Sequence, residues 1–128
     1  MIGLLIVSHS RRLAEGVREL AAQVGAGQVP IAAVGGLEDG TLGTNAQAIR
    51  AAADELVCDE VLVFVDLGSA VMSAEMALEG FSRPFALSNG PLVEGAVLAA
   101  VEASIGADLA RALAAAEAAA TMRKVQPA

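Results

Sequence analysis

The chain of 128 residues contains no tryptophan, no tyrosine and only three phenylalanines, and its 15 acidic side chains outnumber its 8 basic ones. Proteins that stack on nucleic-acid bases need aromatic rings, and proteins that hold the phosphate backbone need a basic surface. With a net charge of −7 the chain offers neither. The composition therefore argues against binding to nucleic acid.

Cysteine and histidine are equally scarce, with one of each in the chain. A single cysteine forms neither an internal disulfide nor a thiolate zinc cluster, which is typical of proteins in a reducing compartment. A single histidine excludes a metal site built from several imidazoles, so we expect no metal. Any histidine chemistry must take place at His9.

Long hydrophobic runs of the kind that mark export or membrane insertion are also missing. The apolar run at residues 1–7 is too short for a signal sequence, and the positive charges of Arg11 and Arg12 follow it instead of preceding it. The alanine-rich stretch at residues 96–120 is interrupted by charges that a membrane span does not tolerate easily. These are Glu102, Asp108, Arg111 and Glu117. We therefore expect a soluble cytoplasmic protein.

Apolar residues nevertheless make up 55% of the chain, and because aromatic residues are few, the core must consist of small aliphatic side chains. A chain of this length is typical of one domain. We expect residues 1–128 to form that single domain, with residues 124–128 frayed.

Four continuous apolar runs predict buried strands, because a strand covered by helices on both faces of its sheet does not alternate with polar residues. The runs are residues 2–7, 29–34, 61–65 and, more weakly, 84–87. Each is followed by a segment with helical spacing.

The first two helical segments each place apolar side chains on one face. In the first, which Ser10 can cap, the face consists of Leu13, Val17, Leu20 and Val24. In the second, capped by Thr44 or Asn45, the face consists of Ala46, Ile49, Ala53 and Leu56.

The remaining helical segments are rich in alanine and methionine. The third covers about residues 69–79 and carries Met72 and Met76, which we expect in the core or in an interface. The fourth begins at Pro91, a residue suited to a first helical position, and aligns Val93, Val97, Val101 and Ile105. A last helix, capped by Asp108, ends near Met122.

The alternation of strands and helices predicts an α/β protein with a doubly wound, flavodoxin-like and mainly parallel sheet, of strand order 2-1-3-4, covered by helices on both faces. In such a sheet ligands bind where the winding reverses, at the carboxyl ends of strands one and three. The residues that follow these two strands are 8–10 and 66–69, so the only histidine lies at the predicted binding crevice.

His9 has the surroundings of a nucleophilic imidazole. Ser8 and Ser10 flank it as hydroxyl donors, and Asp66 ends the neighbouring strand, where a carboxylate can hold one ring nitrogen and leave the other free. The plain alternative is a histidine at a helix start that only hydrogen-bonds its neighbours. Position at the crevice favours the functional interpretation.

The loop at residues 35–45 is rich in glycine and threonine, so its backbone can approach a phosphate while Thr41 and Thr44 donate hydroxyls. It contains no G-x-x-x-x-G-K-[ST] motif and also fits an ordinary connection between a strand and a helix. Arg11 and Arg12 either attract an anionic phosphoryl donor or form part of the solvated surface.

Five segments resemble the phosphotransfer subunit of the phosphoenolpyruvate-dependent dihydroxyacetone kinases, which belongs to the family of mannose-type IIA domains of the sugar phosphotransferase system. They are S-H-S-R-R-L-A-E-G-V at residues 8–17, D-G-T-L-G-T at 39–44, D-L-G-S-A at 66–70, S-A-E-M-A at 73–77 and P-L-V-E-G-A at 91–96. Mannose-type domains tend to carry G-H-G and D-L-F-G-G-S-P where this chain has S-H-S and D-L-G-S-A, which favours the dihydroxyacetone branch.

This resemblance implies a phosphohistidine relay. Phospho-HPr would transfer its phosphoryl group to His9, and His9 would pass it to ADP held on a partner subunit, whose ATP then phosphorylates dihydroxyacetone bound to a third subunit. Asp66 would orient or stabilise the imidazole. The phosphoryl oxygens would be held by Ser8, Ser10, Gly36, Thr41, Gly43, Thr44, Gly68 and Ser69. No permanent cofactor is implied beyond the transient phosphoryl group, and the family is typically homodimeric, with the third and fourth helices as candidate contacts.

Two other functions compete with this interpretation. A mannose-type IIA domain would use the same histidine but donate to a IIB protein, and a non-catalytic binding module could use the same scaffold, because a fold does not fix a function. A serine hydrolase acting through Ser8 or Ser10 is disfavoured, because the chain has no G-x-S-x-G motif and no second histidine to serve as base.

Overall fold

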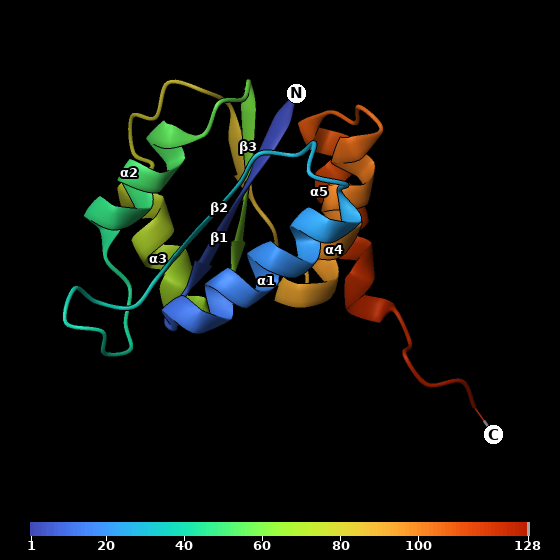
Figure 1. The fold of residues 1–128 in the computed structure, drawn as a ribbon, viewed down its shortest axis with the longest axis horizontal. Helices are drawn as coiled ribbons and strands as arrows, with labels where there is room; N and C mark the ends of the chain where they lie inside the picture. The colour runs from blue at the N-terminus through green and yellow to red at the C-terminus, as the bar shows by residue number, and fades with distance from the viewer. Residues whose placement is uncertain (128) are drawn as a thin grey trace.

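The computed structural model describes residues 1–127 and shows one sheet with helices on both faces (Figure 1). Its elements, in chain order, are β1 (Ile2–Ser8), α1 (Arg11–Val24), β2 (Ile31–Gly35), α2 (Ala46–Glu55), β3 (Glu60–Val65), α3 (Gly68–Ala77), β4 (Phe85–Leu87), α4 (Leu92–Ser104), α5 (Leu109–Ala118) and a short 3-10 turn (Ala119–Thr121).

The sheet confirms the predicted topology. Its four strands are parallel and lie in the order β2-β1-β3-β4, so the chain winds to one side of β1 and then returns to the other. In this register Ser8 lies beside Gly35 of β2, and Val7 lies beside Val65 of β3. The carboxyl ends of β1 and β3 are therefore neighbours at one edge of the sheet, where the crevice was expected.

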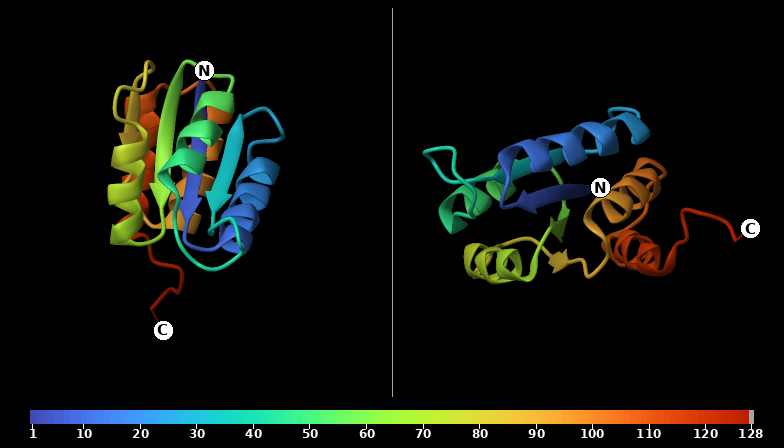
Figure 2. Two further views of the ribbon diagram at one scale, coloured as in Figure 1. Left: turned by 90° about the vertical axis from the view of Figure 1, so that its left-hand side faces the viewer. Right: turned by 90° about the horizontal axis from the view of Figure 1, so that it is seen from below.

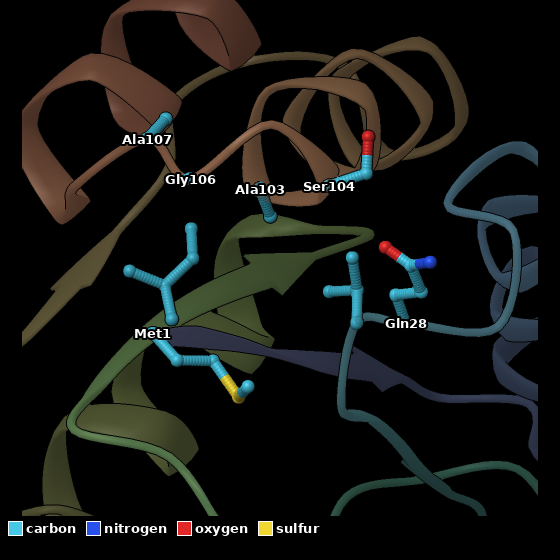
Figure 3. A pocket seen from close by; sticks show the side chains of 8 residues that line it. Met1, Gln28, Ala103, Ser104, Gly106 and Ala107 are labelled. Atoms are coloured by element: carbon cyan, nitrogen blue, oxygen red, sulfur yellow. The ribbon is translucent and has the colours of Figure 1, made fainter.

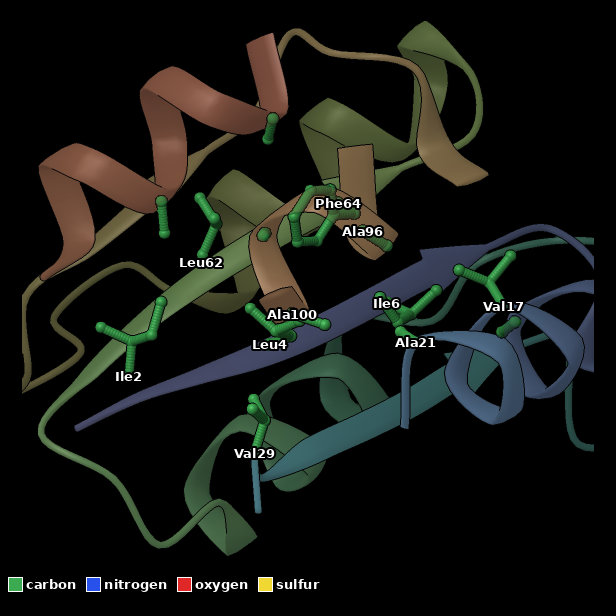
Figure 4. Packing of buried hydrophobic residues seen from close by; sticks show 14 residues of the cluster. Ile2, Leu4, Ile6, Val17, Ala21, Val29, Leu62, Phe64, Ala96 and Ala100 are labelled. Carbon is green, nitrogen blue, oxygen red and sulfur yellow. The ribbon is translucent and has the colours of Figure 1, made fainter. Parts of the chain in front are cut away.

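Two apolar layers hold the helices to the sheet. One layer joins α1, α4 and α5 to residues such as Leu4, Ile6 and Phe64 of the strands (Figure 4), and the other joins α2 and α3 to Leu5, Val7 and their neighbours on the opposite face. The two groups of helices lie on the two sides of the sheet in Figures 1 and 2. β1 is buried along its whole length because both layers cover it.

The helices pack their small residues against the sheet, which corrects the predicted face of α4. Val101 is 39% exposed and Ile105 is 69% exposed, whereas the buried residues of this helix are Gly95, Ala96, Ala99 and Ala100. The strands already supply bulky side chains, so an alanine face lets the helix axis lie close to the sheet. The same reason explains why α1 buries Ala14 and Ala21 while Leu20 stays half exposed.

The interpretation of Met72 and Met76 as core residues is wrong. They are 69% and 70% exposed, and α3 is held to the sheet by Ala70, Ala74 and Ala77. The alternative, an interface role, stays a prediction.

Several element ends differ slightly from the predicted ones. β2 begins at Ile31 instead of Val29, because Pro30 has no N–H for the strand ladder. Pro91 is the residue that caps α4, and the helix itself begins at Leu92. Among the caps, Ser10, Asn45 and Asp108 accept a backbone N–H as expected.

At the C-terminal end, residues 122–127 form neither helix nor strand, and Lys124 Nζ lies 2.7 Å from a Glu94 carboxylate oxygen. The expected fraying of residues 124–128 falls in part on Ala128, which lies outside the described residues. Within residues 1–127, no helix combines the length and the hydropathy that crossing a membrane would require.

Candidate active site

The site lies at the carboxyl edge of the sheet, between the two strands that flank the reversal of winding. His9 stands between the end of β1 and the start of α1, and Asp66 stands between the end of β3 and the start of α3. The two residues are far apart in sequence but meet because β1 and β3 are paired. The predicted pairing of His9 with Asp66 is therefore present in the structure.

The carboxylate of Asp66 ties the ends of the two strands together. One oxygen, Oδ2, accepts hydrogen bonds from the Ser8 hydroxyl and from the His9 backbone N–H, both at 2.9 Å. The other, Oδ1, accepts from the Leu67 N–H at 2.8 Å and lies 3.0 Å from His9 Nδ1. Burial raises the pKa of the Asp66 carboxyl, but the hydrogen bonds from His9 and Ser8 outweigh burial, so the pKa lies below its usual value of 3.8. Asp66 is thus ionised near neutral pH.

An ionised carboxylate only accepts hydrogen bonds, so it decides the tautomer of His9. His9 Nδ1 must carry the proton that faces Asp66 Oδ1, and Nε2 is then unprotonated, with a lone pair that can accept a hydrogen bond or attack phosphorus. The Ser69 hydroxyl lies 2.7 Å from Nε2 and serves as the donor to it. The geometry presents Nε2 as the nucleophilic atom of the site.

The start of α3 adjoins this nitrogen and is open to an anion. Its N-cap residue is Leu67, and no side chain of the described residues caps the helix, in contrast to α1, α2 and α5. The unbonded N–H groups of a helix start and its dipole attract negative charge. Gly68 and Ser69 open α3, so Nε2 faces a place where the oxygens of a phosphoryl group would be stabilised.

The backbone of His9 is braced from the side of β2. Gly43 donates its N–H to the His9 carbonyl at 2.9 Å. Gly35 lies so close that an added Cβ would sit 2.7 Å from the Ser8 carbonyl oxygen and 2.8 Å from that of Ser10. Gly35 is therefore required for the path of the chain through His9.

Most of the predicted phosphoryl-binding hydroxyls form hydrogen bonds away from the His9 imidazole. Of the hydroxyls, only that of Ser69 touches the imidazole. Ser8 holds Asp66, Ser10 caps α1 by accepting from Leu13 N–H, and Thr41 donates to Asp39 Oδ1 at 2.6 Å.

Two further predicted residues, Thr44 and Gly36, also make no contact with the imidazole. The Thr44 hydroxyl lies 2.6 Å from that of Ser73 on α3, which joins the loop after β2 to that helix. Gly36 adopts a left-handed φ of 73°, so it shapes the loop in which it lies. Among residues 1–127, no three His, Cys, Asp or Glu side chains come together as a metal-binding group.

The sequence places Gly35 only in the candidate phosphate-binding loop at residues 35–45 and does not reveal its role in shaping the backbone at His9, because glycine at the end of a strand looks like the start of any loop. The signal that could have found it is the predicted sheet order, which places the last residue of β2 beside Ser8. A glycine at that register leaves room for the chain to turn at the histidine.

Comparison with known proteins places the chain among phosphotransfer proteins. Residues 3–113 match the family EIIA-man, described as the PTS system fructose IIA component. A Lactococcus lactis protein named PTS-dependent dihydroxyacetone kinase, phosphotransferase subunit DhaM, is 38% identical over 105 residues, which cover 82% of this chain and 85% of the relative.

An Escherichia coli protein named PEP-dependent dihydroxyacetone kinase, phosphoryl donor subunit DhaM, is 45% identical over 120 residues, but this chain spans only 25% of its length. The crystal structure of a protein of unknown function, EF1359, superposes with a TM-score of 0.83 at 35% identity and covers 98% of each chain. On this evidence the chain belongs to the EIIA-man family and, within it, to the group of DhaM subunits.

Proposed function

We propose that the chain is a phosphohistidine carrier of a phosphoenolpyruvate-dependent dihydroxyacetone kinase in the cytoplasm. His9 would accept a phosphoryl group from phospho-HPr and pass it to ADP on the nucleotide-binding kinase subunit. The observation that carries the proposal is the hydrogen-bonded Asp66, which holds His9 Nδ1 at 3.0 Å and leaves Nε2 unprotonated. The names of the DhaM relatives support the phosphoryl-donor role and the identity of the kinase.

In the loading step, the lone pair of His9 Nε2 attacks the phosphorus of the donor phosphohistidine. A bond forms between Nε2 and phosphorus while the P–N bond of the donor breaks, and its electron pair remains with the donor imidazole. The phosphorylated ring of His9 keeps its Nδ1 proton and gains positive charge, which the Asp66 carboxylate stabilises.

In the discharge step, an oxygen of the β-phosphate of ADP attacks the same phosphorus from the side opposite Nε2, and Nε2 leaves with the electron pair. The Ser69 hydroxyl, which donates to Nε2 in the free protein, can turn to a phosphoryl oxygen. The open start of α3 stabilises the charge on the remaining oxygens. Such a site works by positioning and charge stabilisation, which is what phosphoryl transfer requires.

The mannose-type IIA alternative shares the loading step and differs only in the acceptor. The names of the relatives favour the dihydroxyacetone kinase. The two acceptors can be compared directly by mixing the loaded chain with an ADP-loaded kinase subunit and, separately, with a IIB protein. Discharge only to the IIB protein would contradict the proposed acceptor.

The central test is labelling with radioactive phosphoenolpyruvate, enzyme I and HPr. We expect one acid-labile phosphoryl group per chain and none in His9→Ala, because the chain has no second histidine. Asp59→Asn is a matched control, since Asp59 precedes β3 and holds the N-terminal amine, away from His9. Label that survives acid, or that appears on His9→Ala, would overturn the phosphohistidine.

The proposed carrier is a homodimer, as the family resemblance implies. Of the two helices expected at the contact we retain α3, and the edge strand β4 takes the place of α4, which packs against α1 and α5. Met72 and Met76 are exposed on α3, and a hollow of about 630 Å³ lies between this helix and β4, with Phe85 and Leu87 in its wall. β4 is the outer strand of the sheet, so its free edge can pair with another chain. Light scattering should show a dimer for the wild type and a monomer for Met76→Lys; a monomeric wild type would contradict this contact.

A further inference from the structure

Five of the eight basic side chains of this acidic protein have partners within the described residues. Four of the eight form ion pairs: Arg18 with Glu15, Arg50 with Asp54, Arg111 with Glu102, and Lys124 with Glu94. Arg83 donates to the backbone carbonyls of Ala53, Leu56 and Cys58. Within the described part of the chain this leaves Arg11, Arg12 and Arg123 without a carboxylate partner. Two of these three cations directly follow His9 and Ser10.

Arg11 and Arg12 line a hollow of about 350 Å³ beside the site. Its wall contains no carboxylate, and consists of Ser10, Arg11, Arg12, Gly36, Leu37, Gly40, Thr41 and Leu42. Of the two acidic residues of this loop, Asp39 accepts two hydrogen bonds from Thr41. In an adjoining hollow, Arg11 lies near Glu38 and Glu15, and Glu15 is held by Arg18.

This hollow adjoins the backbone of the nucleophile on two sides. Ser10 follows His9 in the chain, and Gly43, which follows Leu42, donates its N–H to the His9 carbonyl. A ligand that extends from His9 toward the loop after β2 would therefore meet this cationic surface with its remaining groups. The arginine side chains are long and exposed, and their planar guanidinium groups bind phosphate through paired hydrogen bonds.

The two transfer steps differ in the negative charge that the partner molecule brings to the site in addition to the transferred group. When a phosphohistidine donates, the group that remains on the donor is an imidazole, which carries no phosphate. When a nucleoside diphosphate accepts, its own two phosphates remain at the site beside the transferred group. A chain with a net charge of −7 repels such a polyanion unless a local cationic surface counteracts it.

We propose that Arg11 and Arg12 form a binding surface for the non-transferred phosphates of a nucleoside diphosphate acceptor. This inference rests on the proposed function and deepens it, because it assigns the two arginines to the discharge step and not to loading. The acceptor's diphosphate lies along the hollow while its terminal oxygen reaches the phosphorus on Nε2.

The test separates the two steps in one preparation. Wild type, the Arg11→Ala/Arg12→Ala double variant and Arg18→Ala are loaded from phospho-HPr and then mixed with an excess of the ADP-loaded kinase subunit in a rapid-quench instrument. We expect loading of the double variant to change less than about threefold, while the second-order rate constant of discharge falls roughly 10- to 100-fold and depends less on salt. Arg18→Ala, whose cation is paired on the same helix, should match the wild type in both steps.

Equal losses in both steps, or an unchanged discharge, would overturn the assignment. A second measurement shows whether Arg11 and Arg12 contact the nucleotide or acidic side chains of the kinase subunit. If they contact the nucleotide, the double variant should lose affinity for the ADP-loaded subunit but not for the nucleotide-free one. Equal losses of affinity for both forms would place the arginines against acidic side chains of the partner and reject the proposal. A wild-type chain that fails to load or to discharge overturns the proposed function, and this inference with it.

Discussion

The two ends of the sheet have comparable hollows but opposite chemistry. At the amino end lies a hollow of about 390 Å³ (Figure 3), lined by Met1, Ile2, Gln28, Val29, Ala103, Ser104, Gly106 and Ala107. None of these side chains is titratable, and the amine of Met1 is held by Asp59 at 2.8 Å. The carboxyl end carries His9, Asp66 and two free arginines. The size of a hollow therefore says little about where the chemistry takes place.

The direction of the helices explains this contrast. In a parallel sheet with crossover helices, the helix starts gather at the carboxyl ends of the strands, so that unbonded N–H groups face that edge. At the amino end the carbonyls of two helices are satisfied by arginines: Arg83 donates to Ala53 and Leu56 at the end of α2, and Arg50 donates to Ala77 and Glu79 at the end of α3. The carboxyl end thus offers unbonded N–H groups to an anion, whereas on the α2 and α3 side of the amino end the carbonyls already have cationic partners.

The largest expected effect is that of Asp66→Asn. An amide NH₂ facing His9 Nδ1 would favour the opposite tautomer, with the proton on Nε2, so we expect phosphoryl acceptance to slow by roughly 100- to 10,000-fold. Asp59→Asn alters a carboxylate at the other end of the same strand and should leave the rate unchanged. Rapid-quench labelling measures both, and equal rates in the two variants would remove Asp66 from the mechanism.

Gly35→Ala should have the next largest effect. Its Cβ would meet the carbonyl oxygens of Ser8 and Ser10 at 2.7 and 2.8 Å, so the backbone on both sides of His9 must shift. A displacement of a catalytic group by about 1 Å can cost about 100-fold in rate. We expect a loss of that order in transfer, with an unfolding free energy lowered by about 1–3 kcal/mol. Gly16→Ala, where nothing lies within 4 Å of the new Cβ, is the control; equal activities would show that the site tolerates the shift.

Acid should weaken the carboxyl end of the sheet through Asp66. The pKa of its carboxyl is lower in the folded state than its usual 3.8, so on acidification the unfolded chain takes up the proton first. The stabilisation by Asp66 is thus present above about pH 4 and is lost as the pH falls through the folded-state pKa. Urea unfolding from about pH 7 to about pH 3 should show the stability gap between wild type and Asp66→Asn shrinking. A gap that is constant with pH would contradict the ionised, hydrogen-bonded carboxylate.

The smallest expected effect is at the amino end. Gln28→Ala removes the exposed amide from the far hollow, and we expect unchanged loading and discharge with less than about 0.5 kcal/mol change in unfolding free energy. Labelling kinetics and urea unfolding check both. A loss of transfer in this variant would show that the two ends are coupled and that the contrast between them is incomplete.

The strands, their order and the position of the site could be predicted from the sequence, because continuous apolar runs and alternating helices leave few topologies open. The positions of His9 and Asp66 can be predicted from that order, since each directly follows one of two neighbouring strands. These predictions depend on the continuous apolar runs, on the helical spacing of the segments between them and on chain connectivity, all of which a single sequence contains.

The faces of the helices were harder to predict, because α4 is apolar on most of its surface and several stripes fit its spacing. Hydrophobicity alone predicts that the valines of α4 face the sheet. In the structure the size of the side chain decides the buried face, and Gly95 and Ala99 are buried instead. The partners of the Thr41 and Thr44 hydroxyls could not be predicted for a different reason: a hydroxyl can bond to many groups, and the partners seen, Asp39 and Ser73, are fixed by the path of the loop.

The bridge from His9 to Asp66 also has a consequence for folding experiments. The two residues are separated by 57 positions, so the nucleophile is oriented only after β3 has docked on β1. Local helices that form early in folding leave the imidazole without its carboxylate. Phosphoryl labelling during refolding would therefore measure the long-range pairing of the central strands. The time at which label first appears would be the time at which β3 has docked on β1.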